Sequence, residues 1–218
     1  MDAFEYYFSF FTLIIGLAVA AVARGFGTMW QTRRRAEIGW LTPLLAAFLL
    51  LDISRFWLGL WSRQEIAAMG PLALASVLCV ALPYVFVTTI MFPSEPDDWA
   101  SLDEYYASNS RSIFVVLLFS KIAAYVSDLA LFGWDPAPGD APGIALVLAP
   151  FAVLVLWASA RIHRFGLAFL VAWSAFVFLS APDGQPVSPL PASAPASPPA
   201  PPAGSSAPAP AAPRPPGR

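Results

Sequence analysis

The run Leu41–Trp61, LTPLLAAFLLLDISRFWLGLW, decides the fold class, because it is long and apolar enough to cross a membrane. A transmembrane helix needs about 20 predominantly apolar residues to span a hydrocarbon core roughly 30 Å thick. The run nevertheless contains two ionisable residues, Asp52 and Arg55. Such a residue at the centre of a membrane helix costs about 2.5 to 3.5 kcal/mol on insertion scales, so it is rare and usually paired or functional.

The composition of the whole chain agrees with a membrane protein. Of its 218 residues, 58% are hydrophobic and 12% are charged, whereas soluble domains contain about 25% charged residues. So few charges cannot cover a water-soluble surface once a core is filled. The sequence therefore predicts a polytopic membrane protein whose main partner is the lipid bilayer. The formal net charge of −2 gives no reason to expect a nucleic-acid partner.

Five more apolar segments accompany the first, so the sequence predicts an all-α bundle of six transmembrane helices within residues 1–181. The expected spans are 6–23, 41–61, 71–92, 112–133, 143–160 and 165–181. The last two should form a tight hairpin that turns at 161–164. Between the third and fourth spans, residues 94–110 carry helix-start signals and one apolar face. Either a short interfacial helix on the cytoplasmic surface or a solvated connector fits them.

Residues 182–218 form a separate tail of almost pure Pro, Ala, Ser and Gly. Such a composition cannot bury a core, so we expect disorder with polyproline II character. The run 198–201 matches a loose PxxP pattern, the type of ligand that SH3 and WW domains bind. A match is nearly inevitable in so Pro-dense a tail, and a passive tether or spacer is the favoured interpretation.

Lys and Arg residues concentrate in alternate loops, which predicts the orientation in the membrane. The second loop contains only Arg63, and the fourth, 134–142, contains none. The other three loops contain or adjoin seven basic residues, namely Arg24, Arg33, Arg34, Arg35, Arg111, Arg161 and Arg164. The positive-inside rule then places the odd loops in the cytoplasm and both termini outside it. A bacterial plasma (inner) membrane is the expected location.

A second charged pair, Lys121 and Asp128, lies inside the fourth span. The second and fourth spans run in the same direction, and Asp52 and Lys121 each lie about 1.5 Å from the middle of their span at the helical rise. Arg55 and Asp128 both lie further outward. We therefore predict that the two helices are neighbours, with Asp52 paired to Lys121 and Arg55 paired to Asp128 in a neutral buried quartet.

Three interpretations of the quartet remain open. Buried pairs can fix helix register and partner choice, or a titrating carboxylate can line an ion or proton path. Alternatively, Arg55 or Lys121 snorkels and some charges face a partner subunit. The first interpretation leads to a non-enzymatic structural, assembly or interaction component, with other membrane subunits or a second copy as possible partners. The alternative is a small ion- or proton-coupled transporter or channel.

Enzymatic chemistry has no support in the sequence. It contains no HExxH, GxSxG, Walker A or GxGxxG motif, so we expect no catalytic residues, no metal site and no cofactor. The single His163 is expected to face lipid head groups, and the single Cys79 to be a buried, inert thiol. Trp173 is expected to pack between helices, and Pro83 to kink the third span. The acidic residues of the third loop are expected to form a solvated face.

Overall fold

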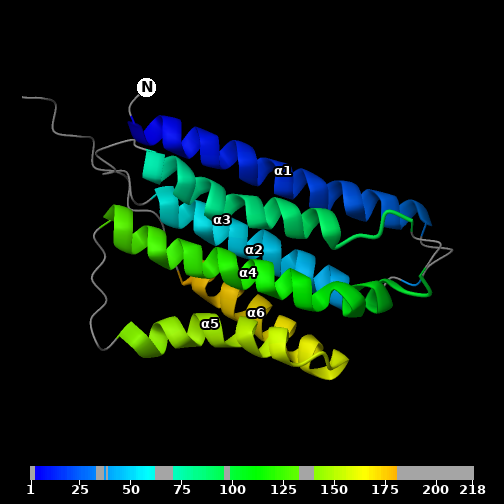
Figure 1. Ribbon diagram of the computed structural model, residues 1–218. Helices are drawn as coiled ribbons and strands as arrows, with labels where there is room; N and C mark the ends of the chain where they lie inside the picture. Colours follow the sequence, from blue (N-terminus) through cyan, green and yellow to red (C-terminus); the bar gives the residue numbers. More distant parts are fainter. Residues whose placement is uncertain are drawn as a thin grey trace, which may run out of the picture. The chain divides into compact units, whose positions relative to one another are not determined.

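The computed structural model describes residues 3–32, 37, 39–61, 71–95, 99–132 and 140–180, and within them it consists of α-helices (Figure 1). The predicted all-α class is confirmed. The predicted tail, 182–218, lies outside the described residues, as do the loop residues 62–70 and 133–139. Six helices are described, namely α1 (Ala3–Thr32), α2 (Leu41–Trp61), α3 (Pro71–Ile90), α4 (Leu102–Phe132), α5 (Ala141–Leu156) and α6 (Ala160–Leu179).

Five of these helices are long and apolar enough to cross a membrane, namely α1, α2, α3, α4 and α6. The remaining helix, α5, has 16 residues, which at the helical rise gives about 24 Å. Large apolar side chains point outward from the bundle: Leu13 is 66% exposed, Leu72 58%, Leu129 56% and Phe165 78%. In a water-soluble protein so many exposed apolar residues would be a liability, whereas lipid accommodates them. The chain is therefore an integral membrane protein.

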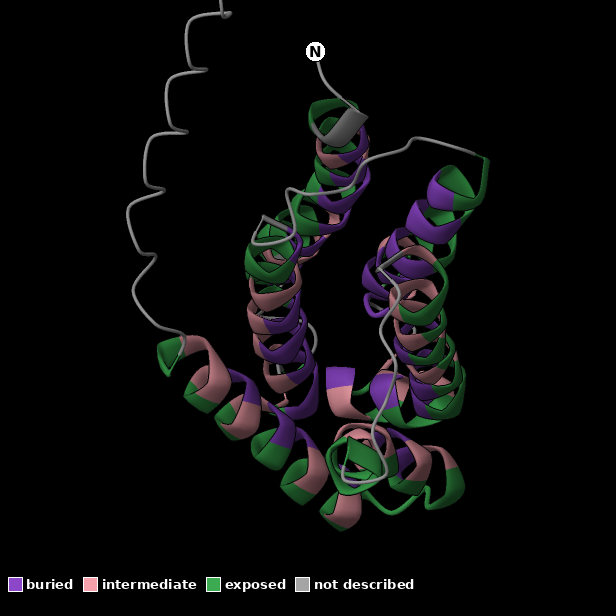
Figure 2. Cartoon of the chain, turned by 90° about the vertical axis from the view of Figure 1, so that its left-hand side faces the viewer, coloured by how far each residue is buried: buried purple, intermediate pink, exposed green. Residues whose placement is uncertain are grey.

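Successive helices run in opposite directions (Figure 1). Helix α3 packs extensively against both α1 and α4, α4 packs against α5, and α2 packs against α6. Helix α2 also touches α1 and α4, so it lies between α6 on one side and α1 and α4 on the other. Figure 2 shows that the buried residues line the sides of the helices that face one another, with exposed residues outside. The outward faces are those that lipid would cover.

Helices α1 and α4 are longer than the expected spans. Helix α1 continues nine residues past the expected end at 23, and α4 begins ten residues before the expected start at 112. Residues 102–110, considered above for a separate interfacial helix, instead form the first turns of α4. No Gly or Pro interrupts the sequence from Leu102 to Phe132. The Oγ of Ser101 accepts a hydrogen bond from the N–H of Glu104 at 3.2 Å, which caps the start of the helix.

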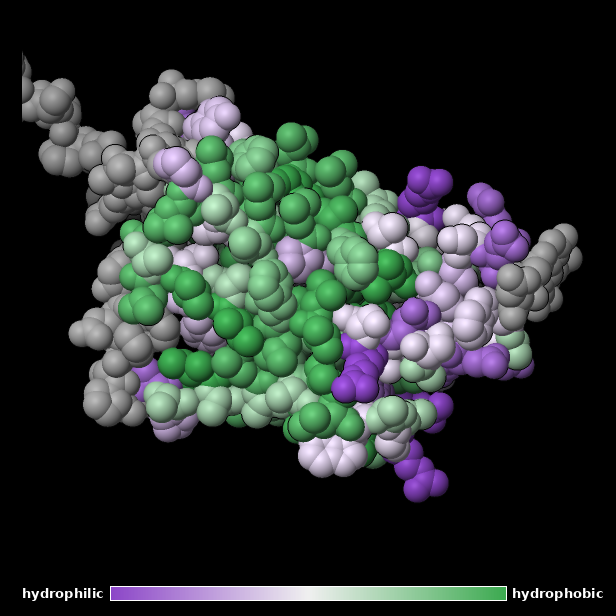
Figure 3. Space-filling view, in the orientation of Figure 1, coloured by the Kyte–Doolittle hydropathy of each residue, from purple (hydrophilic) through white to green (hydrophobic). Residues whose placement is uncertain are grey.

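One end of the bundle is polar. Exposed charged residues gather where α1, α3 and α5 end and α2, α4 and α6 begin, and Figure 3 shows this hydrophilic end beside a broad apolar band. Asp103 of α4 holds the end together. Its Oδ1 accepts a hydrogen bond from the N–H of Leu41 at 2.9 Å, and its Oδ2 lies 3.8 Å from Arg164 of α6. One carboxylate thus caps α2 and links it to two other helices.

The α5–α6 connection differs from the expected turn at 161–164. Residues 157–159 form the turn, and α6 begins directly after Ser159. The N–H of His163 donates to the carbonyl of Ser159 at 3.0 Å, which closes the first turn of α6. Ser159 has extended backbone geometry at this N-cap position, and its side chain makes no capping hydrogen bond.

The expectation for His163 is wrong. Its side chain is 2% exposed, and its Nδ1 lies 2.7 Å from the hydroxyl of Tyr106 on α4. Its Nε2 lies 2.9 Å from the carbonyl of Trp157. Because the carbonyl can only accept, Nε2 carries the proton and Nδ1 accepts from Tyr106. His163 therefore ties α6 to α4 and to the α5–α6 turn instead of facing lipid head groups.

The expectation for Cys79 is also wrong, because its thiol is exposed. Its neighbours on α3, Leu78 and Leu82, are 38% and 48% exposed. This face of α3 points away from α1 and α4. Trp173 is half-buried and stacks on Phe169 of its own helix, with ring centroids 6.4 Å apart. Helix α3 continues through the buried Pro83.

Candidate functional site

Three buried polar side chains from three helices meet in the middle of the bundle. They are Asp52 of α2, Tyr84 of α3 and Lys121 of α4, which are 1%, 1% and 5% exposed. Oδ2 of Asp52 accepts from Nζ of Lys121 at 2.5 Å and from the hydroxyl of Tyr84 at 2.6 Å. Nζ of Lys121 also donates to the Tyr84 hydroxyl at 3.1 Å. We call this closed set of contacts the Asp52 triad.

The Asp52 triad confirms the predicted pair of Asp52 with Lys121. Both residues were expected near mid-membrane on neighbouring helices, and the structure brings them into direct contact. Tyr84 was missed, because a tyrosine in an apolar segment gives the same sequence signal as a packed core aromatic. Its one distinguishing property is a hydroxyl, which needs a hydrogen-bond partner when it is buried.

Local contacts hold α3 in place beside the triad. Pro83, which precedes Tyr84, has no N–H and so leaves one carbonyl of the preceding turn without its helical donor. In that turn, the carbonyl of Val80 accepts a hydrogen bond from the hydroxyl of Ser120 at 2.8 Å. Ser120 precedes Lys121 on α4. The carbonyl that loses its donor is that of Cys79, next to Val80. Consecutive residues of α4 therefore contact α3 at Val80 and at Tyr84, on either side of Pro83.

Lys121 also lies near two aromatic faces. Its Nζ is 5.8 Å from the ring centroid of Tyr84 and 5.7 Å from that of Phe151 on α5. A cation within about 6 Å of an aromatic face is attracted by the ring quadrupole. Phe151 belongs to a cluster with Phe48 and Phe114, whose ring centroids lie 5.7 and 6.4 Å from its own. These three phenylalanines fill the bundle on the polar-end side of the Asp52 triad.

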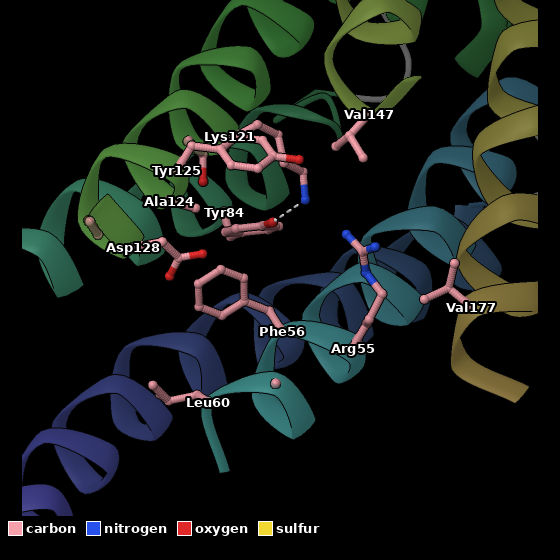
Figure 4. Close-up of a pocket in the computed structure, with 13 residues that line it drawn as sticks. Arg55, Phe56, Leu60, Tyr84, Lys121, Ala124, Tyr125, Asp128, Val147 and Val177 are labelled. Carbon is pink, nitrogen blue, oxygen red and sulfur yellow. Dashed lines mark hydrogen bonds between the residues drawn. The ribbon is translucent and has the colours of Figure 1, made fainter. Parts of the chain in front are cut away.

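Arg55 lies one turn beyond Asp52 on α2 and is less buried. Its Nη2 donates to Oδ1 of Asp52 at 3.3 Å, and its side chain is 30% exposed. Among the described residues, this guanidinium donates to Asp52. Since a guanidinium has five N–H donors in a planar fork, most of them are available on the side away from Asp52. Figure 4 shows Arg55 reaching from α2 toward the space between the helices.

A cavity of about 360 Å³ occupies that space (Figure 4). It is partly open, and it extends from Lys121 and Tyr84 to Leu60 and Asp128, which lie in the last turns of α2 and α4. From Lys121 to Asp128 the helical rise covers about 10 Å. The cavity therefore leads from the middle of the bundle to the end opposite the polar end. Its lining residues are Arg55, Phe56, Gly59, Leu60, Tyr84, Ser120, Lys121, Ala124, Tyr125, Ser127, Asp128, Val147 and Val177.

All members of the predicted quartet are close to this cavity. Arg55, Lys121 and Asp128 line it, and Asp52 lies directly behind Arg55 and Lys121. Figure 4 shows Phe56 between Arg55 and Asp128. The ion pair of Arg55 with Asp128 stays a prediction, whereas the contact of Arg55 with Asp52 was not predicted.

A second, much smaller cavity of about 10 Å³ borders Asp52, Arg55 and Lys121. It is bordered by Phe151 of α5 and by Trp173 and Ser174 of α6. That volume is about the minimum that holds one water molecule, and the surrounding groups are polar enough to bind one. Most of the space next to the Asp52 triad therefore lies in the larger cavity.

The described residues contain no cluster of three or more potential metal ligands among His, Cys, Asp and Glu. The arrangement instead provides a satisfied, buried ion pair next to a partly exposed guanidinium and a cavity of small-molecule size. Such a site can bind a polar group within the membrane or pass one through it. Comparisons with protein-family models, with curated proteins and with solved structures found no match to this chain.

Proposed function

We propose that this protein is a small transporter that binds a polar solute in the middle of the membrane, in the cavity beside the Asp52 triad. The observation that carries the proposal is this cavity of about 360 Å³, which ends at Arg55, Tyr84 and Lys121. Small-molecule sites are concave, mostly apolar, and about 300 to 1,000 Å³ in volume, with few polar groups that fix orientation. The cavity has these properties.

The position of the charges supports transport over a purely structural role. Ionisable residues inside a membrane usually face a bundle interior or a water-filled cavity and mark solute or ion pathways. Arg55 retains 30% exposure of its side chain although it lies in a membrane helix. A structural lock needs only the hydrogen bond from Arg55 to Asp52, whereas a binding site also makes use of the part of the guanidinium that stays exposed beside the cavity.

The proposal includes all six helices as spans, with α5 as the sixth. Helix α5 contacts both α4 and α6, and its Val147 lines the cavity. Under the orientation expected from the basic loops, the cavity opens toward the non-cytoplasmic side. The cluster of Phe48, Phe114 and Phe151 then closes the path toward the cytoplasm. A solute would thus enter from outside and would reach the cytoplasm only after this cluster moves.

A structural or assembly component is the second candidate, and one observation favours it. Both oxygens of Asp52 accept hydrogen bonds, from Arg55, Tyr84 and Lys121. A buried carboxylate satisfied in this way can fix the mutual register of α2, α3 and α4. In this case the cavity is a packing defect that no aqueous solute reaches, or it receives a helix of another membrane subunit.

Cysteine labelling separates the two candidates. The chain has one cysteine, so Cys79→Ser gives a cysteine-free background. In that background, Ala124→Cys places a thiol in the cavity wall, and Val126→Cys places one on the outer face of the same helix, where Val126 is 57% exposed. Methanethiosulfonate reagents that cannot cross membranes, one cationic and one anionic, are applied to oriented vesicles from either side.

A transporter predicts that at least one of the reagents labels Ala124→Cys at least tenfold faster than Val126→Cys, because the reactive thiolate forms in water and not in lipid. It also predicts slower but measurable labelling of Ala124→Cys from the opposite side. Equal, slow rates for the two positions from both sides would contradict the proposed site. Labelling from one side only would contradict transport.

A further inference from the structure

The charges around the cavity identify the class of solute, an inference that rests on the proposed function. Asp52 is shared between two cations, Lys121 at 2.5 Å and Arg55 at 3.3 Å. These three groups together carry one excess positive charge at the deep end of the cavity, and the fourth member of the predicted quartet, Asp128, lies at the open end. An uncompensated charge in a low-dielectric interior is costly, so the site gains stability from an additional anion.

The available donors specify the shape of that anion. The planar fork of a guanidinium matches the two oxygens of a carboxylate and binds them with two parallel hydrogen bonds. Arg55 uses its Nη2 on Asp52 at a long 3.3 Å, and Figure 4 shows the guanidinium facing the cavity on the same side as Lys121. A carboxylate in this position would complete the neutralisation of the two cations.

The remaining walls require an apolar body on the ligand. Phe56, Leu60, Val147 and Val177 contribute only hydrocarbon to the cavity, and the hydroxyls of Ser120 and Ser127 in its lining already donate to helix carbonyls. These walls therefore favour a ligand with an apolar body, because a polar body would lose hydration against them. We propose that the cavity binds a small organic monocarboxylate, with its carboxylate on Arg55 and its apolar body against these walls.

Protection from labelling tests this assignment in the full-length protein. The cavity variant Cys79→Ser/Ala124→Cys is treated with the methanethiosulfonate reagent in the presence of benzoate, benzylamine or benzyl alcohol. The three probes share a ring of similar size and differ in charge. Benzoate should slow labelling at least tenfold at saturation, whereas benzylamine and benzyl alcohol should have little effect. Equal protection by benzylamine would overturn the assignment.

Arg55→Gln in the same background removes the guanidinium and leaves the contacts of Asp52 with Lys121 and Tyr84. The concentration of benzoate that gives half-protection should rise about tenfold or more, because a hydrogen bond to a charged group is lost. Arg55→Lys keeps the charge without the fork and should lie between wild type and Arg55→Gln. Arg111→Gln is the matched control, because Arg111 is exposed on α4 far from the cavity.

The outcomes distinguish a wrong ligand assignment from a failure of the proposed function. If Ala124→Cys is labelled rapidly but benzoate protects no better than benzylamine, the cavity is accessible and the monocarboxylate assignment is wrong. If Ala124→Cys is not labelled at all, the proposed function itself fails. Size-exclusion profiles identify any variant that does not fold, and for Arg55→Gln the milder Arg55→Lys then carries the test. Unchanged half-protection in either folded variant would contradict a role for Arg55.

Discussion

Asp52 is the residue that joins the centre of the molecule. Its carboxylate contacts Arg55 on its own helix, Tyr84 on α3 and Lys121 on α4. Each of these groups would be costly alone in a membrane, but together they satisfy one another's hydrogen bonds. Removal of any one member therefore leaves the others buried without a partner and lowers the stability of the protein. The contribution of the ion pair can be measured as this loss.

We expect Asp52→Asn to destabilise the protein in detergent by about 3 kcal/mol, because it leaves Lys121 buried without a counter-charge. Lys121→Met should have a similar effect, since it leaves Asp52 with only the partly exposed Arg55 as a cation. The readout is the denaturant or temperature midpoint of the monodisperse peak in size exclusion.

The double variant Asp52→Asn/Lys121→Met removes both buried charges and should recover part of the loss. The interaction free energy between the two sites follows from the complete mutant cycle. Ser54→Ala, at an exposed position of the same helix, is the control and should stay within about 0.5 kcal/mol of wild type. Additive losses in the double variant would show that the contact of Asp52 with Lys121 does not stabilise the fold.

At the residue scale, sequence reasoning succeeded where charge and depth were informative. Asp52 and Lys121 could be paired because few other groups at that depth can satisfy them. His163 could not be placed, because its basic neighbours suggested a loop, while its burial depends on α6 starting at Ala160. The exposure of Cys79 likewise depends on which face of α3 points to lipid, and the uniformly apolar sequence of α3 does not indicate that face.

At the scale of the helices, the apolar runs predicted the number of helices, but they underestimated the lengths of α1 and α4. Hydropathy falls where a helix leaves the membrane, and the helix itself ends only where capping or a helix breaker ends it. Residues 102–110 are polar but remain helical. The spacing Ser101-x-x-Glu104 was the available signal for the start of α4.

We expect Asp103→Ala to destabilise the protein by about 1 kcal/mol, because the N–H of Leu41 at the start of α2 loses its acceptor. The contact with Arg164, at 3.8 Å and largely exposed, should add little. A side chain at Gly39 would collide with the Asp103 carboxylate and displace it. Gly39→Ala should therefore reproduce part of the loss.

Glu104→Ala is the control for Asp103→Ala. It removes the neighbouring carboxylate in the same turn of α4, and this carboxylate contacts only the local N–H of Ala100 at 3.3 Å among the contacts described. Thermal midpoints in size exclusion compare the two variants. A loss for Glu104→Ala as large as that for Asp103→Ala would attribute the effect to the α4 terminus itself and not to the contact with α2.

At the scale of the whole molecule, the cavity could not be predicted from the sequence. Its volume depends on how five helices pack, and residues such as Gly59, Ala124 and Val177 are common in any membrane helix. What the sequence does indicate is a difference between the two ends of the bundle. Exposed basic residues Arg24, Arg111, Arg161 and Arg164 all belong to the polar end.

We expect this polar end to face the cytoplasm. Ser108 is exposed near the start of α4, so Ser108→Cys in the Cys79→Ser background reports its side. In intact cells, a membrane-impermeant maleimide should leave this thiol unlabelled, and labelling should appear after permeabilisation. Rapid labelling of intact cells would show the opposite orientation, and the cavity would then open toward the cytoplasm.

The cavity reaches the middle of the bundle from one end only, and this determines where a membrane potential acts. If water fills the cavity as far as Arg55, the outer solution extends electrically to mid-membrane, and the potential drops mainly across the phenylalanine cluster of Phe48, Phe114 and Phe151. A monoanion would then reach Arg55 with little electrical work. Its passage beyond the cluster would change its energy by about 2.3 kcal/mol per 100 mV. Voltage would therefore act on release to the other side and leave binding nearly unaffected.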